Sequence, residues 1–131
     1  MHIVASAVTF EPIEMGTPHL TIKDMITTLD ASGLGGTTPQ VVATFAVVLG
    51  PHERGAQMRS QVRLRAPSGK AIAQPEKLEA IPPERPYTWV IQHRGAFEAT
   101  EYGCYEFRLF VNGKLAATAP LYVLPKGQKS P

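Results

Sequence analysis

The sequence predicts an all-β fold, a sandwich of two antiparallel sheets. Three observations support this prediction. Apolar and polar residues alternate over several short stretches, which is the period of a strand with one buried face. No helical period persists over a long stretch. The 12 prolines and 11 glycines are scattered along the chain as single residues and pairs, which suits short strands joined by turns.

The segment 103–123 carries the clearest pattern, a strand on each side of the turn Asn112-Gly113. In the first strand the apolar residues that share one parity are Tyr105, Phe107, Leu109 and Val111; in the second they are Leu115, Ala117, Ala119, Leu121 and Val123. Asn and Gly tolerate the positive φ angles of tight turns, so a hairpin is expected here. A two-residue loop would put the two apolar sets on opposite faces. We therefore expect a three-residue loop in which Gly113 takes the left-handed position of a G1 bulge and Leu115 faces the core.

Strand character continues along the rest of the chain. The segments concerned are 3–10, 20–29, 41–49, 58–66 and 87–93, with a short strand starting at 70–73. The apolar parity changes at Lys23-Asp24, which predicts a bulge. Segment 74–86 contains four prolines, so we expect a surface connection there, with room for one helical turn over 76–81. With the hairpin, these segments predict an immunoglobulin-like antiparallel β-sandwich of about seven strands.

Length and composition fit a single domain. The chain has 131 residues, of which 44% are apolar and 18% charged. We expect residues 1–125 to form the domain and residues 126–131 to be a flexible tail. The single cysteine, Cys104, excludes an internal disulfide framework. No apolar run is long enough to span a bilayer, and the N-terminus lacks the basic region of a signal peptide, so the chain is expected to be cytoplasmic with no membrane partner.

Three segments together resemble a known group of proteins. They are LTIKDMITTL at 20–29, VRLRAPSGKAI at 62–72 and GCYEFRLFVNGKLAATAPLYV at 103–123. They resemble a family of small, uncharacterised bacterial β-sandwich proteins, a domain of unknown function. The resemblance spans most of the chain and implies the sandwich fold. It transfers no catalytic or ligand-binding residue to this sequence.

No catalytic or metal-binding constellation emerges from the sequence. The histidines are His2, His19, His52 and His93. None of them has a close ligand spacing, and one cysteine cannot complete a thiolate set, so we expect no metal and no cofactor. Cys104 shares a strand parity with Glu106, but nothing brings a histidine near, and an inert thiol is expected. The sequence therefore favours a protein that is not an enzyme. A small enzyme with a site assembled from several strands is the weakest alternative.

Basic residues line one face of the predicted strand 58–66. They are Arg59, Arg63 and Arg65, with Lys70 in the following turn. The strand period puts the three arginines on one face over roughly 20 Å. Such a stripe could bind nucleic acid or another anionic polymer. The net charge is only +2, and no aromatic residue is interleaved on this strand face, so a solvated face is favoured and nucleic acid is disfavoured as a partner.

Segment 41–49 is apolar on both of its faces. Val42, Ala46 and Val48 lie on the face that a sandwich core would not need. If nothing within the chain covers this face, a second copy would, so these residues are candidates for an oligomer interface, with a dimer favoured. The sequence thus predicts a non-catalytic protein that acts through protein–protein contacts, with itself or with an unknown protein partner.

Overall fold

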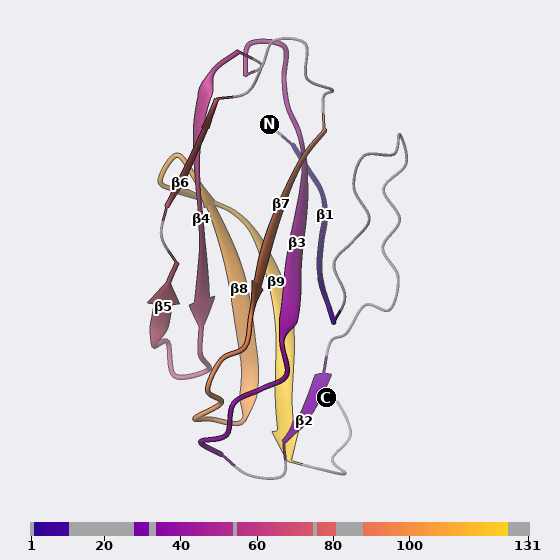
Figure 1. Cartoon of the computed structure of the whole chain (residues 1–131), viewed down its shortest axis with the longest axis vertical. Helices are drawn as coiled ribbons and strands as arrows, with labels where there is room; N and C mark the ends of the chain where they lie inside the picture. Colours follow the sequence, from indigo (N-terminus) through magenta and orange to yellow (C-terminus); the bar gives the residue numbers. More distant parts are fainter. Residues whose placement is uncertain are drawn as a thin grey trace.

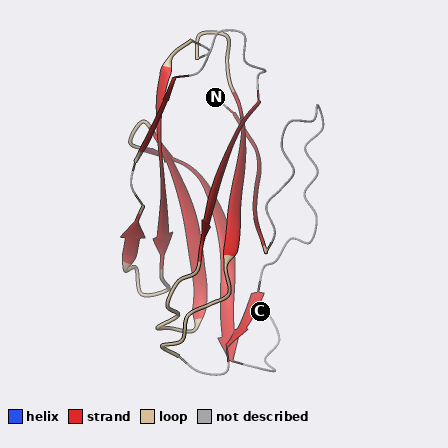
Figure 2. Cartoon of the chain, in the orientation of Figure 1, coloured by secondary structure: helices blue, strands red, loops and turns tan. Residues whose placement is uncertain are grey.

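A computed structural model describes residues 2–10, 28–31, 34–53, 55–74, 76–80 and 88–125. These residues contain nine strands and no helix (Figure 2). The strands are β1 (His2–Thr9), β2 (Thr28–Ala31), β3 (Val41–Val48), β4 (Gln57–Arg65), β5 (Ala71–Ala73), β6 (Lys77–Ala80), β7 (Thr88–Gly95), β8 (Gly103–Val111) and β9 (Lys114–Pro125). The prediction of an all-β chain is confirmed. No helix in the described part could cross a lipid bilayer.

The strands form two sheets that pack against each other like a sandwich (Figure 1). Sheet A has the strand order β1-β3-β7. Sheet B has the order β2-β9-β8-β4-β5, and β6 also pairs with β4. Among the described strands every pairing is antiparallel except that of β2 with β9, which is parallel. Sheet B is therefore the wider layer, and its β5 end extends past sheet A.

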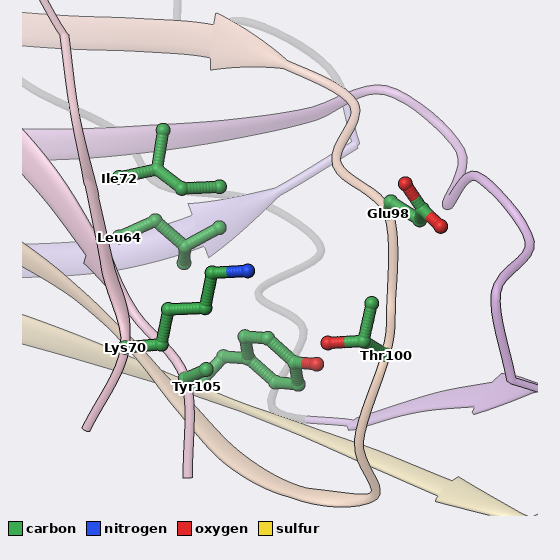
Figure 3. Close-up of a pocket in the computed structure, with 7 residues that line it drawn as sticks. Leu64, Lys70, Ile72, Glu98, Thr100 and Tyr105 are labelled. Atoms are coloured by element: carbon green, nitrogen blue, oxygen red, sulfur yellow. The ribbon is translucent and has the colours of Figure 1, made fainter. Parts of the chain in front are cut away.

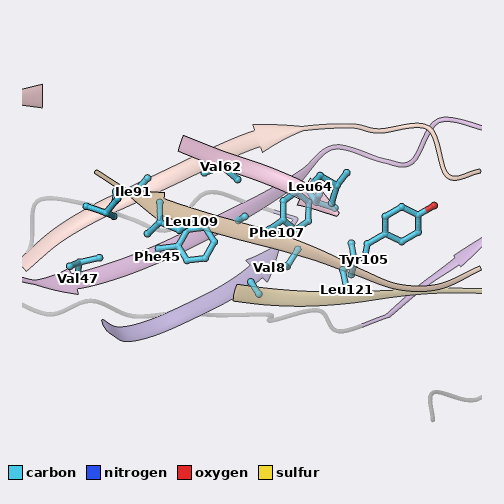
Figure 4. Packing of buried hydrophobic residues seen from close by; sticks show 14 of the residues in the cluster. Val8, Phe45, Val47, Val62, Leu64, Ile91, Tyr105, Phe107, Leu109 and Leu121 are labelled. Atoms are coloured by element: carbon cyan, nitrogen blue, oxygen red, sulfur yellow. The ribbon is translucent and has the colours of Figure 1, made fainter. Parts of the chain in front are cut away.

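One apolar core lies between the two sheets (Figure 4). Sheet A contributes Val8, Phe45, Val47 and Ile91, and sheet B contributes Val62, Leu64, Phe107, Leu109 and Leu121. Within each strand these residues are two apart or a multiple of two, because successive side chains point to opposite faces. Burying an aliphatic or aromatic side chain of this size stabilises the fold by about 1.5–3 kcal/mol. The alternation read from the sequence therefore selects the face of each strand that holds the sheets together.

Most strands lie where alternation predicts them. The expected segments 3–10, 41–49, 58–66 and 87–93 correspond to β1, β3, β4 and β7, with ends displaced by one or two residues, and the short strand at 70–73 is β5. The expected strand 20–29 meets the described residues only at Thr28 and Leu29, which begin β2. Its remaining part, including the bulge at Lys23-Asp24, lies outside the described residues, as does the tail 126–131.

The prediction of a surface connection over 74–86 is wrong for residues 77–80, which form β6 and make no helical turn. β5 and β6 both pair with β4, as the partners Arg63↔Ala73 and Ser60↔Lys77 show. Between these partners β4 advances by three residues and the opposite side by four. β5 and β6 are therefore two halves of one edge strand with a single-residue offset.

The predicted loop of the C-terminal hairpin is also wrong. Val111 pairs with Lys114, so the loop has two residues rather than three. Asn112 has a φ angle of 50° and Gly113 of 82°, and two positive values in succession identify a type I′ turn. Leu115 is 48% exposed instead of facing the core.

A bulge in β9 then restores the match between the apolar faces of the hairpin. Phe110 pairs with Leu115, but Leu109 pairs with Ala117, so Ala116 is the additional residue. Beyond the bulge, Ala119, Leu121 and Val123 are all buried. One additional residue is needed to bring the apolar sides of the two strands onto the same face. That residue lies within β9 and not in the loop.

Candidate functional site

One side of the sandwich gives access to the core between the edges of the two sheets. A cavity of about 270 Å³ lies there between the end of β7 and the edge formed by β4 and β5. It is lined by Leu64, Ile72, Gln74, His93, Gly95, Ala96, Phe97, Glu98 and Phe107. A smaller cavity of about 100 Å³ shares Leu64, Ile72 and Glu98 with it and reaches Lys70, Thr100 and Tyr105 (Figure 3). We call the two cavities together the edge cleft.

The edge cleft exists because the two sheets differ in width. Ile72 of β5 lies directly opposite Leu64 of β4, so both side chains belong to the inner face of sheet B. Leu64 is buried, whereas Ile72 is 53% exposed, since β5 extends beyond the cover of the three-stranded sheet A. Among the described strands, β7 pairs only with β3, and β5 and β6 pair only with β4. The edge cleft is therefore bordered by two strand edges whose outer backbone groups have no strand partner in the described part.

The charged side chains of the edge cleft lie at its rim. Lys70 and Glu98 reach it from opposite walls (Figure 3), and both are exposed. The Tyr105 hydroxyl is already engaged: it donates to the Glu101 carbonyl at 3.1 Å and accepts from the Glu101 amide at 3.2 Å. These two bonds fix the turn that leads into β8. The hydroxyl thus has a structural role, and the interior of the edge cleft is mainly apolar.

His93 is the one histidine that lines the edge cleft. It is half-buried, and its ring centroid lies 6.3 Å from that of Phe107. Burial lowers the pKa of His93 below 6.5, and the positive charge of Lys77 lowers this pKa further. A Cβ atom on Gly95 would come within 3.4 Å of His93 Nε2, so the backbone approaches the ring closely. Glu98 is the one carboxylate among the residues that line the edge cleft. No group of three or more metal-ligating side chains occurs within the described ranges.

Cys104 lies apart from the edge cleft. It is in β8 opposite Tyr122 of β9, on the outer face of sheet B. Burial raises the pKa of the Cys104 thiol, and the negative charge of Glu106 raises this pKa further. Both effects favour the protonated thiol, which is a poor nucleophile.

The structure brings three of the four predicted basic residues together. Arg59, Arg63 and Arg65 lie on the outer face of sheet B, whereas Lys70 lines the edge cleft. Arg59 forms an exposed ion pair with Glu76 at 3.9 Å. Arg63 Nε donates to Gln61 at 2.8 Å. Two of the three guanidinium groups therefore have partners within the chain.

Sequence reasoning missed residues that neighbouring strands add to this face. Arg108 lies directly opposite Arg63 in the β4–β8 ladder. Phe110 lies under the Arg63 guanidinium, with 4.0 Å between the guanidinium carbon and the ring centroid. Arg108 Nε is 3.3 Å from Glu106 Oε2, yet it is buried and makes no hydrogen bond. The parity of β8 carried the signal, because Glu106, Arg108 and Phe110 alternate with its core residues.

The predicted oligomer interface is largely covered within the single chain. Val42 is 1% exposed and Ala46 is 0% exposed, while Val48 is half-buried. Thr44 between them is also buried, and its hydroxyl accepts a bond of 3.3 Å from Gln92 Nε2. A partner could not reach Val42 or Ala46 unless part of this chain moved. The surplus apolar face of β3 therefore no longer argues for a dimer.

The sequence matches no protein-family model, and no curated protein matches it significantly. The function must be argued from the geometry of the edge cleft and of the outer face of sheet B.

Proposed function

We propose that this chain is a non-catalytic, immunoglobulin-like sandwich that acts by binding another protein at the edge cleft. One observation carries the proposal: a cavity of about 270 Å³, lined by more apolar than polar surface, opens between two strand edges that are unpaired in the described part of the chain. Apolar cavities favour the burial of apolar side chains, and strand edges offer backbone donors and acceptors. This combination suits a polypeptide ligand, which brings both kinds of group.

Two features support the immunoglobulin-like assignment. Immunoglobulin domains place strands A, B and E in one sheet and C, F and G in the other. The orders β1-β3-β7 and β4-β8-β9 follow the same pattern. Tyr105, near the start of β8, bonds back to the backbone of Glu101, which resembles the tyrosine corner of such domains. Phe107, two residues later, occupies the position at which antibody domains carry a cysteine.

Catalysis is disfavoured because the lining of the edge cleft lacks a reactive pair. A hydrolytic site needs a nucleophile and a base within hydrogen-bond reach of each other. The lining contains one histidine, His93, and the one hydroxyl group that is buried there, that of Tyr105, is bonded to the backbone. Binding without chemistry is the function that these groups support best.

Selection from a library of random peptides displayed on phage tests the proposal. Peptides that bind at the edge cleft should lose about tenfold or more in affinity for Ile72→Asp, because a charge would replace part of the apolar wall. Leu115→Asp is the matched control, since Leu115 is similarly exposed at 48% but lies on β9. If every selected peptide binds Ile72→Asp as tightly as the natural chain, the edge cleft is not the binding site.

A second candidate function is the binding of an anionic polymer on the outer face of sheet B. Arg63 and Arg108 lie directly opposite each other, and like charges at such positions repel. A phosphate or carboxylate group would relieve this repulsion, and Phe110 supplies an aromatic surface beside it.

Fluorescence anisotropy of a labelled single-stranded oligonucleotide tests this second function. Binding should weaken steeply as salt is raised, and Arg108→Gln should weaken it more than the exposed control Lys114→Gln. An unchanged anisotropy at low salt would reject nucleic acid as the ligand.

A further inference from the structure

The two edges that border the edge cleft are not equally open to a new strand. The β5–β6 edge is interrupted by its single-residue offset, and it carries Lys77. Interruptions and lysines are devices that discourage strand addition. β7 has neither a register shift nor a proline over its eight residues. Its outer edge is thus the one better suited to accept a strand.

The backbone of β7 is already held in the geometry that an added strand needs. β7 pairs with β3 from Val48↔Thr88 to Val41↔Gly95. The pairing continues past its end, where Thr38 N donates to Phe97 O at 2.8 Å. In an antiparallel pair, alternate residues direct their N–H and C=O groups away from the partner. On β7 these groups point to the side opposite β3, where sheet A has no further described strand.

The size of the cavity beside β7 selects the kind of group that fits. An apolar cavity of about 150 Å³ can hold a benzene ring, whereas sites for small-molecule ligands usually span about 300–1,000 Å³. At about 270 Å³, the larger cavity of the edge cleft suits one large apolar side chain. Phe97, Phe107 and Ile72 supply apolar walls for it.

We propose that the edge cleft binds an extended segment of a partner protein, which adds as a strand to β7 and inserts one aromatic or large aliphatic side chain into the cavity. This inference rests on the proposed function and specifies the conformation and chemistry of the partner. Main-chain hydrogen bonds to β7 would supply affinity, and the cavity would supply specificity for the anchoring side chain. Since side chains of a strand alternate, residues two positions from the anchor would also face the protein.

The test uses soluble forms of the phage-selected peptides with the full chain. Each peptide is methylated at one backbone nitrogen at a time, which removes a donor without changing the side chains. Methylation at alternate positions should weaken binding by about tenfold, and methylation at the intervening positions should have little effect. Replacing the anchoring side chain by alanine should also weaken binding by about tenfold. Hydrogen exchange at alternate amides of β7 should slow when peptide is added.

The outcomes separate this inference from the proposed function. Peptides that need Ile72 but tolerate methylation at every nitrogen would overturn strand addition and leave binding at the edge cleft intact. A selection that yields no Ile72-dependent peptide would overturn the proposed function itself. Each comparison is repeated with Ile72→Thr, which shortens the apolar side chain without introducing a charge. If the chain without peptide forms a dimer in which hydrogen exchange at the β7 amides is slowed, a second copy of the chain occupies the edge cleft. That result would overturn the inference.

Discussion

Asn112 joins the C-terminal hairpin to the centre of sheet B. Its φ angle of 50° forms the first half of the I′ turn. Its side-chain oxygen accepts from the Arg59 amide at 2.9 Å, and its own amide donates to the Arg59 carbonyl at 2.8 Å. The turn residue therefore continues the ladder between β8 and β4. One residue thus forms a local turn through its backbone and bonds through its side chain to a strand more than 50 residues away in the sequence.

We expect Asn112→Ala to lower the free energy of unfolding by about 1–2 kcal/mol, because alanine is strained at positive φ and removes the acceptor for Arg59. Asn112→Gly removes the acceptor and the weak bond of 3.7 Å from Asn112 Nδ2 to Met58 Sδ but introduces no backbone strain, so its cost should be smaller. Asn112→Asp keeps the acceptor. Urea denaturation of the three variants measures these differences. Equal losses for the glycine and alanine variants would show that backbone strain contributes nothing.

His93 should make the stability of the fold depend on pH. Burial and Lys77 lower its pKa in the folded chain below 6.5. The unfolded chain therefore binds a proton at His93 more readily than the folded chain does. The contribution of neutral His93 to the free energy of unfolding should be fully present above the pKa of the unfolded state, and it should be lost as the pH drops from about 6.5 toward the folded pKa. His93→Gln should reduce this fall. Urea midpoints measured across that range test the prediction, with exposed His52 changed to Gln as the control. Identical pH profiles for His93→Gln and the natural chain would contradict it.

At the scale of elements, the C-terminal hairpin shows how far sequence patterns reach. Alternation identifies the core residues of β8 and of most of β9. For both sets to face the core, one additional residue must lie between them in the sequence. Alternation does not say where that residue lies. Asn-Gly strongly prefers a two-residue turn, and this preference places the additional residue in β9. As a result Leu115 is exposed and a bulge forms at Ala116. Local turn chemistry outweighs the burial of one leucine.

The two leucines on either side of the bulge should respond differently to truncation. Leu121→Ala should lower the free energy of unfolding by about 2–5 kcal/mol, because Leu121 is fully buried in the core. Leu115→Ala should change it by no more than about 0.5 kcal/mol, since Leu115 is exposed. Thermal or urea unfolding of both variants checks the bulge. Similar losses for the two variants would mean that Leu115 faces the core after all.

The edge cleft could not be predicted from the sequence, for a physical reason. Its walls come from β4, β5, β8 and the end of β7, and only the pairing of strands distant in the sequence sets them side by side. Period two reveals which face of a strand is buried, but not which strand is its neighbour. The same limit explains Phe110, which lies beside Arg63 although no pattern within β4 indicates it. The arginine face of β4, by contrast, follows directly from alternation.

At the scale of the whole molecule, the apolar strand β3 is enclosed on both faces within one chain. Phe45 and Val47 face sheet B, and Val42 and Ala46 on the opposite face are buried as well. The sequence showed that β3 needs cover on two sides, but not whether that cover comes from the same chain. In this structure the described burial does not depend on a second subunit.

Ala46→Asp should therefore unfold the single chain rather than separate two chains. A buried, unpaired carboxylate costs several kcal/mol, and about 3 kcal/mol or more of lost stability is expected. Circular dichroism and light scattering at matched concentrations test this, with Leu115→Asp as the exposed control. A variant that keeps its folded spectrum and melting temperature but loses half its mass would place Ala46 between subunits.

The parallel pairing of β2 with β9 has a consequence for synthesis on the ribosome. Thr28–Ala31 pairs with Tyr122–Pro125, the last residues described. At about 5–20 residues per second, translation takes on the order of ten seconds to span that interval. During this time β3, apolar on both sides, has left the ribosome before β8 and β9 exist. The nascent chain should be a client for chaperones that shield β3 until the final hairpin emerges.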